Sequence, residues 1–173
     1  GKDVIVIGGG DTGSDCVATA LRHGCRSVTQ FGTRAMAPPA RDPVRNPWPQ
    51  FPNVYTLDYA HEEAKALFGK DPRVFAVLTK KFVGDGNGRV KELHTVGIER
   101  IVDETGRKIY KEIPGTERVW KADLVLIAVG FEGPERTLIE ELGLETDRRS
   151  NVKAEYGKYR TNVEKVFAAG DMR

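Results

Sequence analysis

The stretch Val4-Ile5-Val6-Ile7-Gly8-Gly9-Gly10-Asp11-Thr12-Gly13 runs from four apolar residues straight into a Gly-x-Gly-x-x-Gly turn. This order predicts a strand, a phosphate-binding turn and a helix, and it points to a dinucleotide cofactor. Gly8 would permit the tight turn, Gly10 would let a pyrophosphate approach the backbone, and Gly13 would let the helix pack closely on the strand. The phosphates would lie at the helix N-terminus, where free N–H groups and the helix dipole favour an anion. The alternative is an ordinary β–α turn without a ligand.

The composition narrows the class of protein. The chain has 173 residues, of which 39% are hydrophobic, enough for about one domain with a proper core. The net charge of +2 gives no reason to expect a nucleic acid or a membrane as partner. No apolar run is long enough to span a bilayer and there is no signal peptide, so we expect a cytoplasmic location. Cys16 and Cys25 form no Cys-x-x-Cys pair, which argues against a disulfide framework, a metal site and a redox-active dithiol.

The pattern behind the first turn continues the α/β alternation. It predicts helices over residues 12–22 and 61–68 and strands over residues 27–31 and 54–57. Six of the nine prolines fall between residues 38 and 52, so that segment cannot be a helix or a central strand. We expect an ordered surface loop there, called the proline loop below, with Trp48 and Phe51 packed down on the protein.

The second half of the chain is first β-rich and then returns to α/β. Strands over residues 73–83, 90–102 and 108–113, with turns at 84–88 and 103–106, predict an antiparallel β-meander. The unbroken apolar run from residue 124 to 129 is typical of the buried centre of a parallel sheet. A helix over 134–142 and a last strand over 166–169 follow. The predicted fold class is therefore α/β, a Rossmann-like parallel sheet with an inserted antiparallel β-meander, in three layers.

Residues at the end of the second strand should determine whether the site prefers NAD or NADP. A site that prefers NAD places an acid about 20 residues past the glycine turn, to accept from the ribose 2′-hydroxyl. Residues 16–41 contain no acid, and Gly32-Thr33-Arg34 stands at the expected place. Thr33 and Arg34 can supply donors and charge for a 2′-phosphate, with Arg41 and Arg45 helping if the proline loop folds over the adenosine end. We therefore expect NADP(H) rather than NAD(H); a solvated Arg34 without a ligand is the alternative.

Further segments make the chain recognisable when they are taken together. They are Gly8-Gly9-Gly10-Asp11-Thr12-Gly13-Ser14-Asp15-Cys16, Asn46-Pro47-Trp48-Pro49-Gln50-Phe51-Pro52, Phe68-Gly69-Lys70-Asp71-Pro72-Arg73, and Thr161-Asn162-Val163 through Val166-Phe167-Ala168-Ala169-Gly170-Asp171. In combination they resemble the small (β) subunit of glutamate synthase, a flavoprotein of the pyridine nucleotide-disulfide oxidoreductase type. The resemblance covers nearly the whole chain. It implies an NAD(P)H-binding domain inserted in an FAD-binding domain, behind an amino-terminal iron–sulfur domain.

This resemblance assigns the parts of the chain. Residues 1–144 would be the NAD(P)H-binding domain and residues 145–173 a returning, incomplete segment of the FAD-binding domain. The chain begins almost on a core strand and ends just after Gly170-Asp171, so we expect a piece of a longer polypeptide. It contains neither the first flavin fingerprint nor the cluster cysteines of the family. One departure is Gly32, where the NADH-type members have a glutamate.

The resemblance also implies cofactor contacts for two later turns. Ala128-Val129-Gly130 resembles the Ala-x-Gly turn that passes near the nucleotide in two-domain flavoprotein reductases, although a simple strand-to-helix turn is the alternative. In the family, the aspartate of Gly170-Asp171 binds the ribityl chain of FAD. The candidate cofactor-binding residues are thus Gly8, Gly9, Gly10, Asp11, Thr12, Gly13, Thr33, Arg34, Arg41, Gly130, Gly170 and Asp171.

Some of these and other polar residues have a simpler interpretation. For Asp11 we favour a capping role at the helix start, since a carboxylate facing a pyrophosphate would repel it. Thr12 either donates to a phosphate oxygen or is a second cap. His23, His61 and His94 have no ligand or triad spacing, and we assign them to a helix end, a helix start and a strand face.

The implied activity belongs to the whole parent protein. Hydride would pass from NADPH to FAD, and electrons would then pass through iron–sulfur clusters to a large (α) subunit that forms glutamate from glutamine and 2-oxoglutarate. No side chain of this chain is expected to act as a catalytic acid or base, and the chain alone should bind nucleotide and catalyse nothing. Two alternatives stay open: a related FAD/iron–sulfur reductase subunit with another acceptor, and a non-catalytic nucleotide-binding or subunit-docking module.

Overall fold

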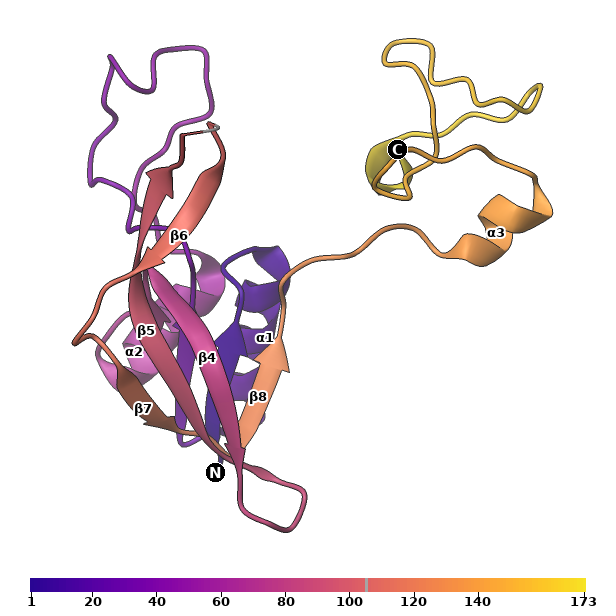
Figure 1. The fold of residues 1–173 in the computed structure, drawn as a ribbon. Helices are drawn as coiled ribbons and strands as arrows, with labels where there is room; N and C mark the ends of the chain where they lie inside the picture. Colours follow the sequence, from indigo (N-terminus) through magenta and orange to yellow (C-terminus); the bar gives the residue numbers. More distant parts are fainter. Residues whose placement is uncertain (105) are drawn as a thin grey trace. The chain divides into compact units, whose positions relative to one another are not determined.

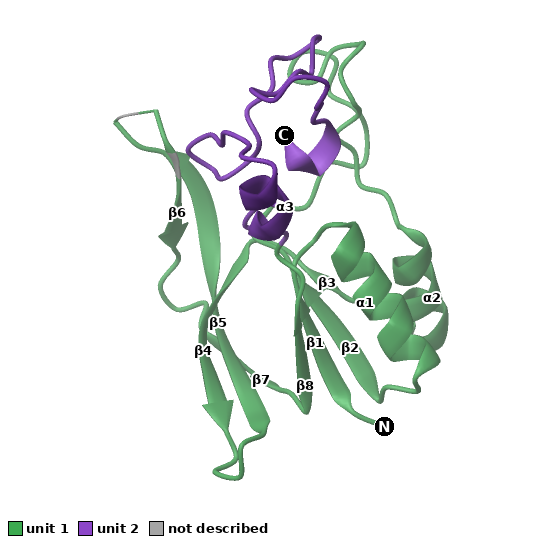
Figure 2. Ribbon diagram, turned by 90° about the vertical axis from the view of Figure 1, so that its right-hand side faces the viewer, with its two compact units in different colours: residues 1–129 green, residues 130–173 purple. Residues whose placement is uncertain are grey.

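The computed structural model describes residues 1–104 and 106–173 and divides them into two compact units. The first unit is Gly1–Val129 and the second is Gly130–Arg173; Figure 2 distinguishes them by colour. The predicted turn at residues 103–106 includes Thr105, which lies outside the described residues. No helix in the described ranges is long and apolar enough to cross a membrane.

A four-stranded parallel sheet forms the middle of the first unit. Its strands are β1 (Asp3–Ile7), β2 (Ser27–Phe31), β3 (Arg73–Val74) and β8 (Leu124–Ile127), in the order β3-β2-β1-β8. The register pairs Ile7 with Phe31 on one side and with Ile127 on the other, so three strands end level with one another. The first two predicted strands are confirmed.

The third parallel strand is not the predicted one. Residues 54–57 form no strand, and β3 takes that place beside β2. The physical reason is that the backbone of Tyr55 is bound elsewhere, because its N–H donates to the Pro38 carbonyl within the proline loop.

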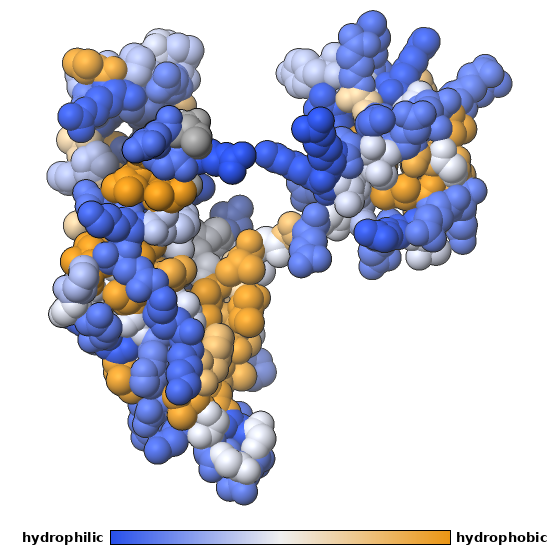
Figure 3. All heavy atoms as spheres, in the orientation of Figure 1, coloured by the Kyte–Doolittle hydropathy of each residue, from blue (hydrophilic) through white to orange (hydrophobic). Residues whose placement is uncertain are grey.

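The apolar run of residues 124–129 forms a strand, but the prediction that this strand is central is wrong. Among the described strands β8 pairs with β1 alone, so it lies at the edge of the sheet. Ile127 is 68% exposed and Val129 71% exposed. Figure 3 shows apolar residues gathered on this side of the first unit. An apolar composition alone therefore does not distinguish a central strand from an edge strand.

Two helices cover one face of the parallel sheet. Helix α1 (Asp11–Arg22) and helix α2 (Tyr59–Phe68) agree with the predicted helices. Alternation along β1 turns Val4 and Val6 toward them, and the buried side chains of this layer are Val4, Val6, Val17, Ala18, Ala20, Leu21, Val28, Ala60, Ala64 and Ala128. Helix α2 ends at Gly69, whose φ of 77° is the left-handed conformation that glycine adopts at no steric cost.

An antiparallel sheet covers the other face (Figure 1). It contains β4 (Val77–Gly84), β5 (Val90–Val102), β6 (Lys108–Glu112) and β7 (Arg118–Lys121). β4 pairs with one edge of β5, and β6 and β7 pair with successive parts of β5. Ile5, Phe31, Leu93 and Ala122 form the core between the two sheets. The predicted three-layer α/β fold with an inserted antiparallel meander is thus confirmed.

Two details of the meander differ from the prediction. The strand predicted over residues 73–83 is divided at Ala76, whose φ is 51°, into β3 in the parallel sheet and β4 in the antiparallel sheet. The meander also has a fourth strand, β7, which the sequence analysis did not separate. It carries Trp120, whose ring lies 5.0 Å from that of Phe31 between the sheets.

The second unit has little regular structure. It contains the short helix α3 (Arg136–Glu141), a 3-10 turn η1 (Gly170–Met172) and a small core of Ile139, Val152 and Ala168. The helix predicted over 134–142 is confirmed at its centre. The strand predicted over 166–169 is wrong, since Phe167 makes a single bridge to Arg160. Positive φ angles at Lys165 and Gly170 turn the backbone on both sides of that bridge.

The proline loop is ordered by polar contacts rather than by its aromatic residues. Trp48 is 84% exposed and Phe51 90% exposed, so the prediction that they pack down is wrong. The loop is held instead by the side chains of Arg41 and Asn46, which bond to backbone groups of the loop and of Asn53 directly after it. Because these bonds fix the backbone, the loop needs no apolar contact to keep its shape.

Candidate functional site

The predicted nucleotide-binding segments meet at the carboxyl end of the parallel sheet. The Gly8 N–H donates to the Phe31 carbonyl over 2.9 Å, and the Ala128 N–H donates to the Ile7 carbonyl over 2.7 Å. The ends of β1, β2 and β8 therefore lie side by side. This is the edge at which open parallel sheets bind ligands.

Two glycines of the turn are required by the fold itself. Gly8 has a φ of 132°, and a Cβ there would lie 1.9 Å from the carbonyl oxygen of Ala128. A Cβ at Gly13 would lie 2.3 Å from the carbonyl oxygen of Gly8. No side chain fits at either distance, so β1, β8 and α1 can come this close only through glycine.

Packing within the fold does not explain why residue 10 is a glycine. A Cβ there would meet no described atom within 4 Å, and its φ of −98° is open to any residue. The fold therefore does not require Gly10, whereas a ligand that approaches the backbone would. Its predicted contact with a pyrophosphate stays a prediction.

The N-terminus of α1 is open to an anion. Gly10 is the N-cap residue, and no side chain in the described part of the chain caps the helix. The capping roles considered for Asp11 and Thr12 are therefore wrong. The first N–H groups of a helix lack partners within it, and the helix dipole adds partial positive charge.

The segment Gly32-Thr33-Arg34 lies next to the glycine turn. A Cβ at Gly9 would lie 4.0 Å from the Cα of Gly32. The segment is fixed to β3 and β4, because Gly32 bonds to the backbone of Val74 and Val77. Tyr110 on β6 donates from its hydroxyl to Oγ1 of Thr33 over 3.2 Å.

Arg34 differs from the other arginines considered for the nucleotide. Its side chain is exposed, and among the described residues no carboxylate pairs with it. Arg41 instead donates to three carbonyl oxygens of the proline loop, over 2.7 Å to Asn46, 3.0 Å to Pro47 and 2.6 Å to Gln50. Arg45 lies 3.7 Å from Asp42. Arg34 is thus the arginine whose charge is free to meet a phosphate beside the turn.

Two buried polar residues lie in contact beneath the turn: His61 is at a helix start, as predicted, whereas its partner Gln30 was not predicted. Gln30 on β2 and His61 on α2 lie 2.7 Å apart, and Gln30 also bonds to the carbonyl of Gly8. A capping box joins Asp58 and His61 at the start of α2. The spacing Asp58-x-x-His61 could have revealed the box, but no sequence signal connects it with Gln30.

The other candidate residues belong to the second unit. Gly130 has a φ of 98° and is exposed two positions after Ala128. Gly170 and Asp171 border a hollow of about 630 Å³, whose lining residues are Phe131, Glu132, Gly133, Pro134, Arg149, Asn151, Gly170, Asp171, Met172 and Arg173. Arg149 and Arg173 bring positive charge to this hollow beside Asp171. The predicted contacts of Gly130 with the nucleotide and of Asp171 with a flavin stay predictions.

Comparison with known proteins agrees with this architecture. The family model described as pyridine nucleotide-disulphide oxidoreductase matches residues 1–173. The "Glutamate synthase [NADPH] small chain" of Bacillus subtilis is 54% identical over 173 residues, which are 100% of this chain and 35% of that protein. "Glutamate synthase [NADH]" of Schizosaccharomyces pombe is 46% identical over 100% of this chain and 8% of that protein. The resemblance seen in the motifs is therefore confirmed, and the chain spans about a third of the length of the Bacillus relative.

Solved structures share the fold at low sequence identity. Lactococcus lactis thioredoxin reductase matches with a TM-score of 0.57 and 19% identity, covering 100% of this chain and 45% of that chain. Mycobacterium tuberculosis FprA in complex with NADPH matches with a TM-score of 0.57 and 17% identity, covering 94% of this chain and 45% of that chain. At this identity the likeness supports the fold alone.

Proposed function

Because this chain belongs to the pyridine nucleotide-disulphide oxidoreductase family, we propose that it is the NADPH-binding domain of a glutamate synthase small subunit. The observation that carries the proposal is the exposed Arg34 beside the glycine turn, which pairs with no carboxylate of the described residues and follows a strand end without an acid. The whole-length similarity to a protein named as an NADPH glutamate synthase small chain points in the same direction.

Each part of the nucleotide has residues of matching chemistry. The pyrophosphate would lie against Gly9, Gly10 and the uncapped start of α1, with the Thr12 hydroxyl as a further donor. The 2′-phosphate would lie at Thr33 and Arg34, where a guanidinium can donate two parallel hydrogen bonds to a phosphate. Arg41 would hold the proline loop in shape, and Arg45 would face the adenosine end.

The bound dinucleotide would supply a hydride for FAD in the full-length protein. The residues of this chain bind and orient the nucleotide, and no side chain needs to move a proton. Electrons would leave the flavin through iron–sulfur clusters towards a large subunit that forms glutamate from glutamine and 2-oxoglutarate. In this proposal residues 1–144 hold the nucleotide, with Gly130 near it. Residues 145–173 belong to the FAD-binding domain, with Gly170 and Asp171 at the ribityl chain.

Calorimetric titration of the protein with NADP⁺ and NAD⁺ tests the cofactor assignment. The oxidised forms are used so that no redox step contributes heat. We expect wild type to prefer NADP⁺, and Arg34→Ala to lose about tenfold or more in affinity for NADP⁺ with little change for NAD⁺, since one charge-assisted contact is removed. Arg89→Ala, an exposed arginine in the turn between β4 and β5, is the matched control and should change neither affinity. Equal binding of the two nucleotides by wild type would refute the 2′-phosphate assignment.

A second candidate function, a subunit-docking module, is favoured by the proline loop. A polar framework holds this loop while Trp48 and Phe51 are exposed, and exposed aromatic residues on an ordered backbone are typical of interface anchors. Reduction of bound flavin by NADPH in the full-length protein, followed by absorbance, distinguishes the two functions. A purely docking module would leave the flavin oxidised.

A further inference from the structure

Hydrogen bonds run beneath the glycine turn through two buried side chains. Gln30 is 1% exposed and His61 4% exposed. The Nε2 amide of Gln30 donates to the Gly8 carbonyl over 2.8 Å, and Nε2 of His61 lies 2.7 Å from Oε1 of Gln30. At the far end, the Asp58 N–H donates to Nδ1 of His61 over 3.3 Å. We call this series, from Asp58 through His61 and Gln30 to Gly8, the Gln30–His61 relay.

Backbone groups at the two ends fix the direction of every hydrogen in the relay. A carbonyl oxygen only accepts, so Gln30 must present its NH₂ group to Gly8. A backbone N–H only donates, so Nδ1 of His61 must carry no proton. His61 is therefore neutral, holds its proton on Nε2, and donates it to Gln30. In this arrangement each side-chain nitrogen and oxygen of Gln30 and His61 has a hydrogen-bond partner.

The surroundings of His61 favour the neutral ring. Burial lowers its pKa, and the positive charge of Arg73 on β3 lowers it further. The carboxylates of Asp71, before β3, and of Asp58, at the start of α2, act in the opposite direction. These three groups are the charges that act on the ring, and burial is the largest effect.

The relay also fixes the orientation of the Gly8–Gly9 peptide group. The Gly8 N–H bonds to Phe31, and the Gly8 carbonyl points inward to Gln30. In a trans peptide the carbonyl and the following N–H point in opposite directions. The N–H of Gly9 is therefore aimed away from the buried pair, toward the exposed side of the turn.

We propose that Gln30 and His61 are positioning residues for the nucleotide, which hold the Gly9 N–H toward the pyrophosphate by anchoring the Gly8 carbonyl. The inference rests on the proposed nucleotide function. It adds two residues that touch no ligand and that lie 31 positions apart in the chain. Both NADP⁺ and NAD⁺ carry the pyrophosphate, so the relay should affect the two nucleotides equally.

Two substitutions of His61 separate the relay from the helix cap. His61→Gln places an amide N–H near the position of Nε2, so it keeps the donor to Gln30 and loses the acceptor for Asp58. His61→Asn places an oxygen near Nδ1, so it keeps the acceptor and loses the donor. We expect His61→Asn, but not His61→Gln, to weaken binding of NADP⁺ and of NAD⁺ by about tenfold each, the usual effect of one lost positioning contact. Calorimetry on the full-length protein measures both affinities.

Gln30→Met keeps the size of the side chain and removes the donor to Gly8, so it should reproduce His61→Asn, and it decides the question if His61→Asn does not fold. Val28→Ala is the control: Val28 is buried on the same face of β2, and its truncation should lower stability without changing either affinity. Equal affinities of His61→Asn and His61→Gln, with wild type binding both nucleotides, would overturn the inference alone. Absence of binding by wild type would refute the proposed function, and the inference with it.

Discussion

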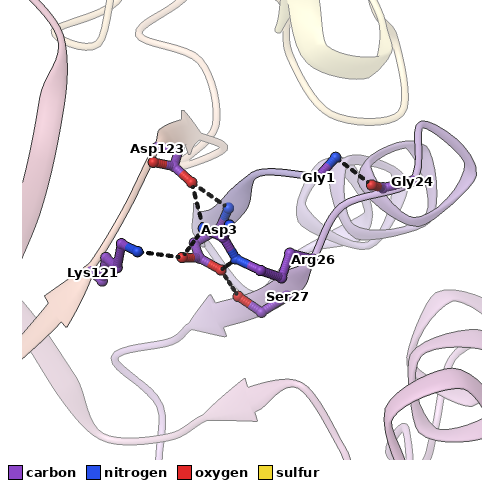
Figure 4. Close-up of polar contacts among 7 residues, drawn as sticks. All are labelled: Gly1, Asp3, Gly24, Arg26, Ser27, Lys121 and Asp123. Carbon is purple, nitrogen blue, oxygen red and sulfur yellow. Dashed lines mark hydrogen bonds and ion pairs between the residues drawn. The ribbon is translucent and has the colours of Figure 1, made fainter.

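The two ends of the parallel sheet are built from different chemistry. At the amino end, charged side chains connect the strands: Arg26 contacts both Asp3 and Asp123, and Ser27 and Lys121 complete the cluster (Figure 4). At the carboxyl end, backbone hydrogen bonds, glycines and the neutral side chain of Gln30 connect the strands. Of the charged side chains there, Arg34 has no carboxylate partner among the described residues.

This difference separates stability from binding. The charges at the amino end are paired with one another, so they stabilise the fold and are not available to bind a ligand. The open N–H groups and the free Arg34 at the carboxyl end contribute less to the fold and can bind an anion. The neutral Gln30–His61 relay fixes the binding end from beneath without adding charge to it. Each of the following substitutions tests this division.

Gly8→Ala should have the largest effect, because Gly8 lies at the binding end and has the shortest Cβ approach of the two glycines that the fold requires there. Its Cβ would lie 1.9 Å from the Ala128 carbonyl at a φ of 132°. Since neither backbone segment can withdraw without breaking the sheet, we expect a loss of more than about 4 kcal/mol in the free energy of unfolding, or no folded protein. Urea unfolding followed by circular dichroism measures it.

Gly10→Ala is the matched control two residues further on. Nothing lies within 4 Å of its Cβ, so we expect it to cost at most about 1 kcal/mol and to weaken nucleotide binding. If Gly8→Ala folded as well as Gly10→Ala, the claim that the fold requires Gly8 would be wrong.

The glycine turn illustrates how much of the fold the sequence could predict. Local patterns sufficed for β1, α1, β2 and the turns that join three strands of the meander, because a glycine fingerprint, helical spacing and turn residues each act within a few positions. The fold class and the juxtaposition of Gly8 with Gly32-Thr33-Arg34 followed from parallel pairing. Here local preference and tertiary structure agree.

The predictions that failed depended on partners distant in the chain. The apolar β8 lies at an edge because no further strand of the described chain pairs with it. Residues 54–57 form no strand because β3 pairs with β2 instead. Trp48 and Phe51 are exposed because Arg41 holds the proline loop instead. The contact between Gln30 and His61 was missed for the same reason, since it joins a strand to a helix that begins 28 residues after β2 ends. Composition does not encode these pairings.

Asp3→Asn tests the amino end and should have an intermediate effect. The hydrogen bond from Arg26, helped by Ser27, lowers the pKa of Asp3 from 3.8 to about 2 against the opposing effect of burial. Because the folded pKa lies below the ordinary value, the stabilisation is complete above pH 3.8 and is lost as the pH falls through about 2. It amounts to at most about 2 kcal/mol at neutral pH, because water screens part of the interaction, and Asp3→Asn should remove it. Urea unfolding of both proteins between pH 2 and pH 7, about the range that spans this titration, measures the difference.

Asp123→Asn provides the graded control for this prediction. Asp123 contacts the same Arg26 at 3.0 Å but is more exposed than Asp3, so its loss should lower stability by less. Nucleotide affinity should be unchanged in both variants. A change in affinity on either substitution would contradict the separation of the two ends.

Asp11→Asn should have the smallest effect. It should lower the stability of the fold and raise the affinity for the nucleotides. Asp11 is the acidic residue in the first turn of α1, where its charge favours the helix but repels a phosphate. Its removal should lower stability by about 0.5 kcal/mol and raise the affinity for NADP⁺ and NAD⁺ by about threefold, the range expected for one exposed charge. The control is Glu62→Gln, which removes the acid in the first turn of α2. It should lower stability by about as much as Asp11→Asn but leave the affinity for both nucleotides unchanged. Should both variants bind the nucleotides as wild type does, the anion would not lie at the start of α1. Arg34 would then act without that helix terminus.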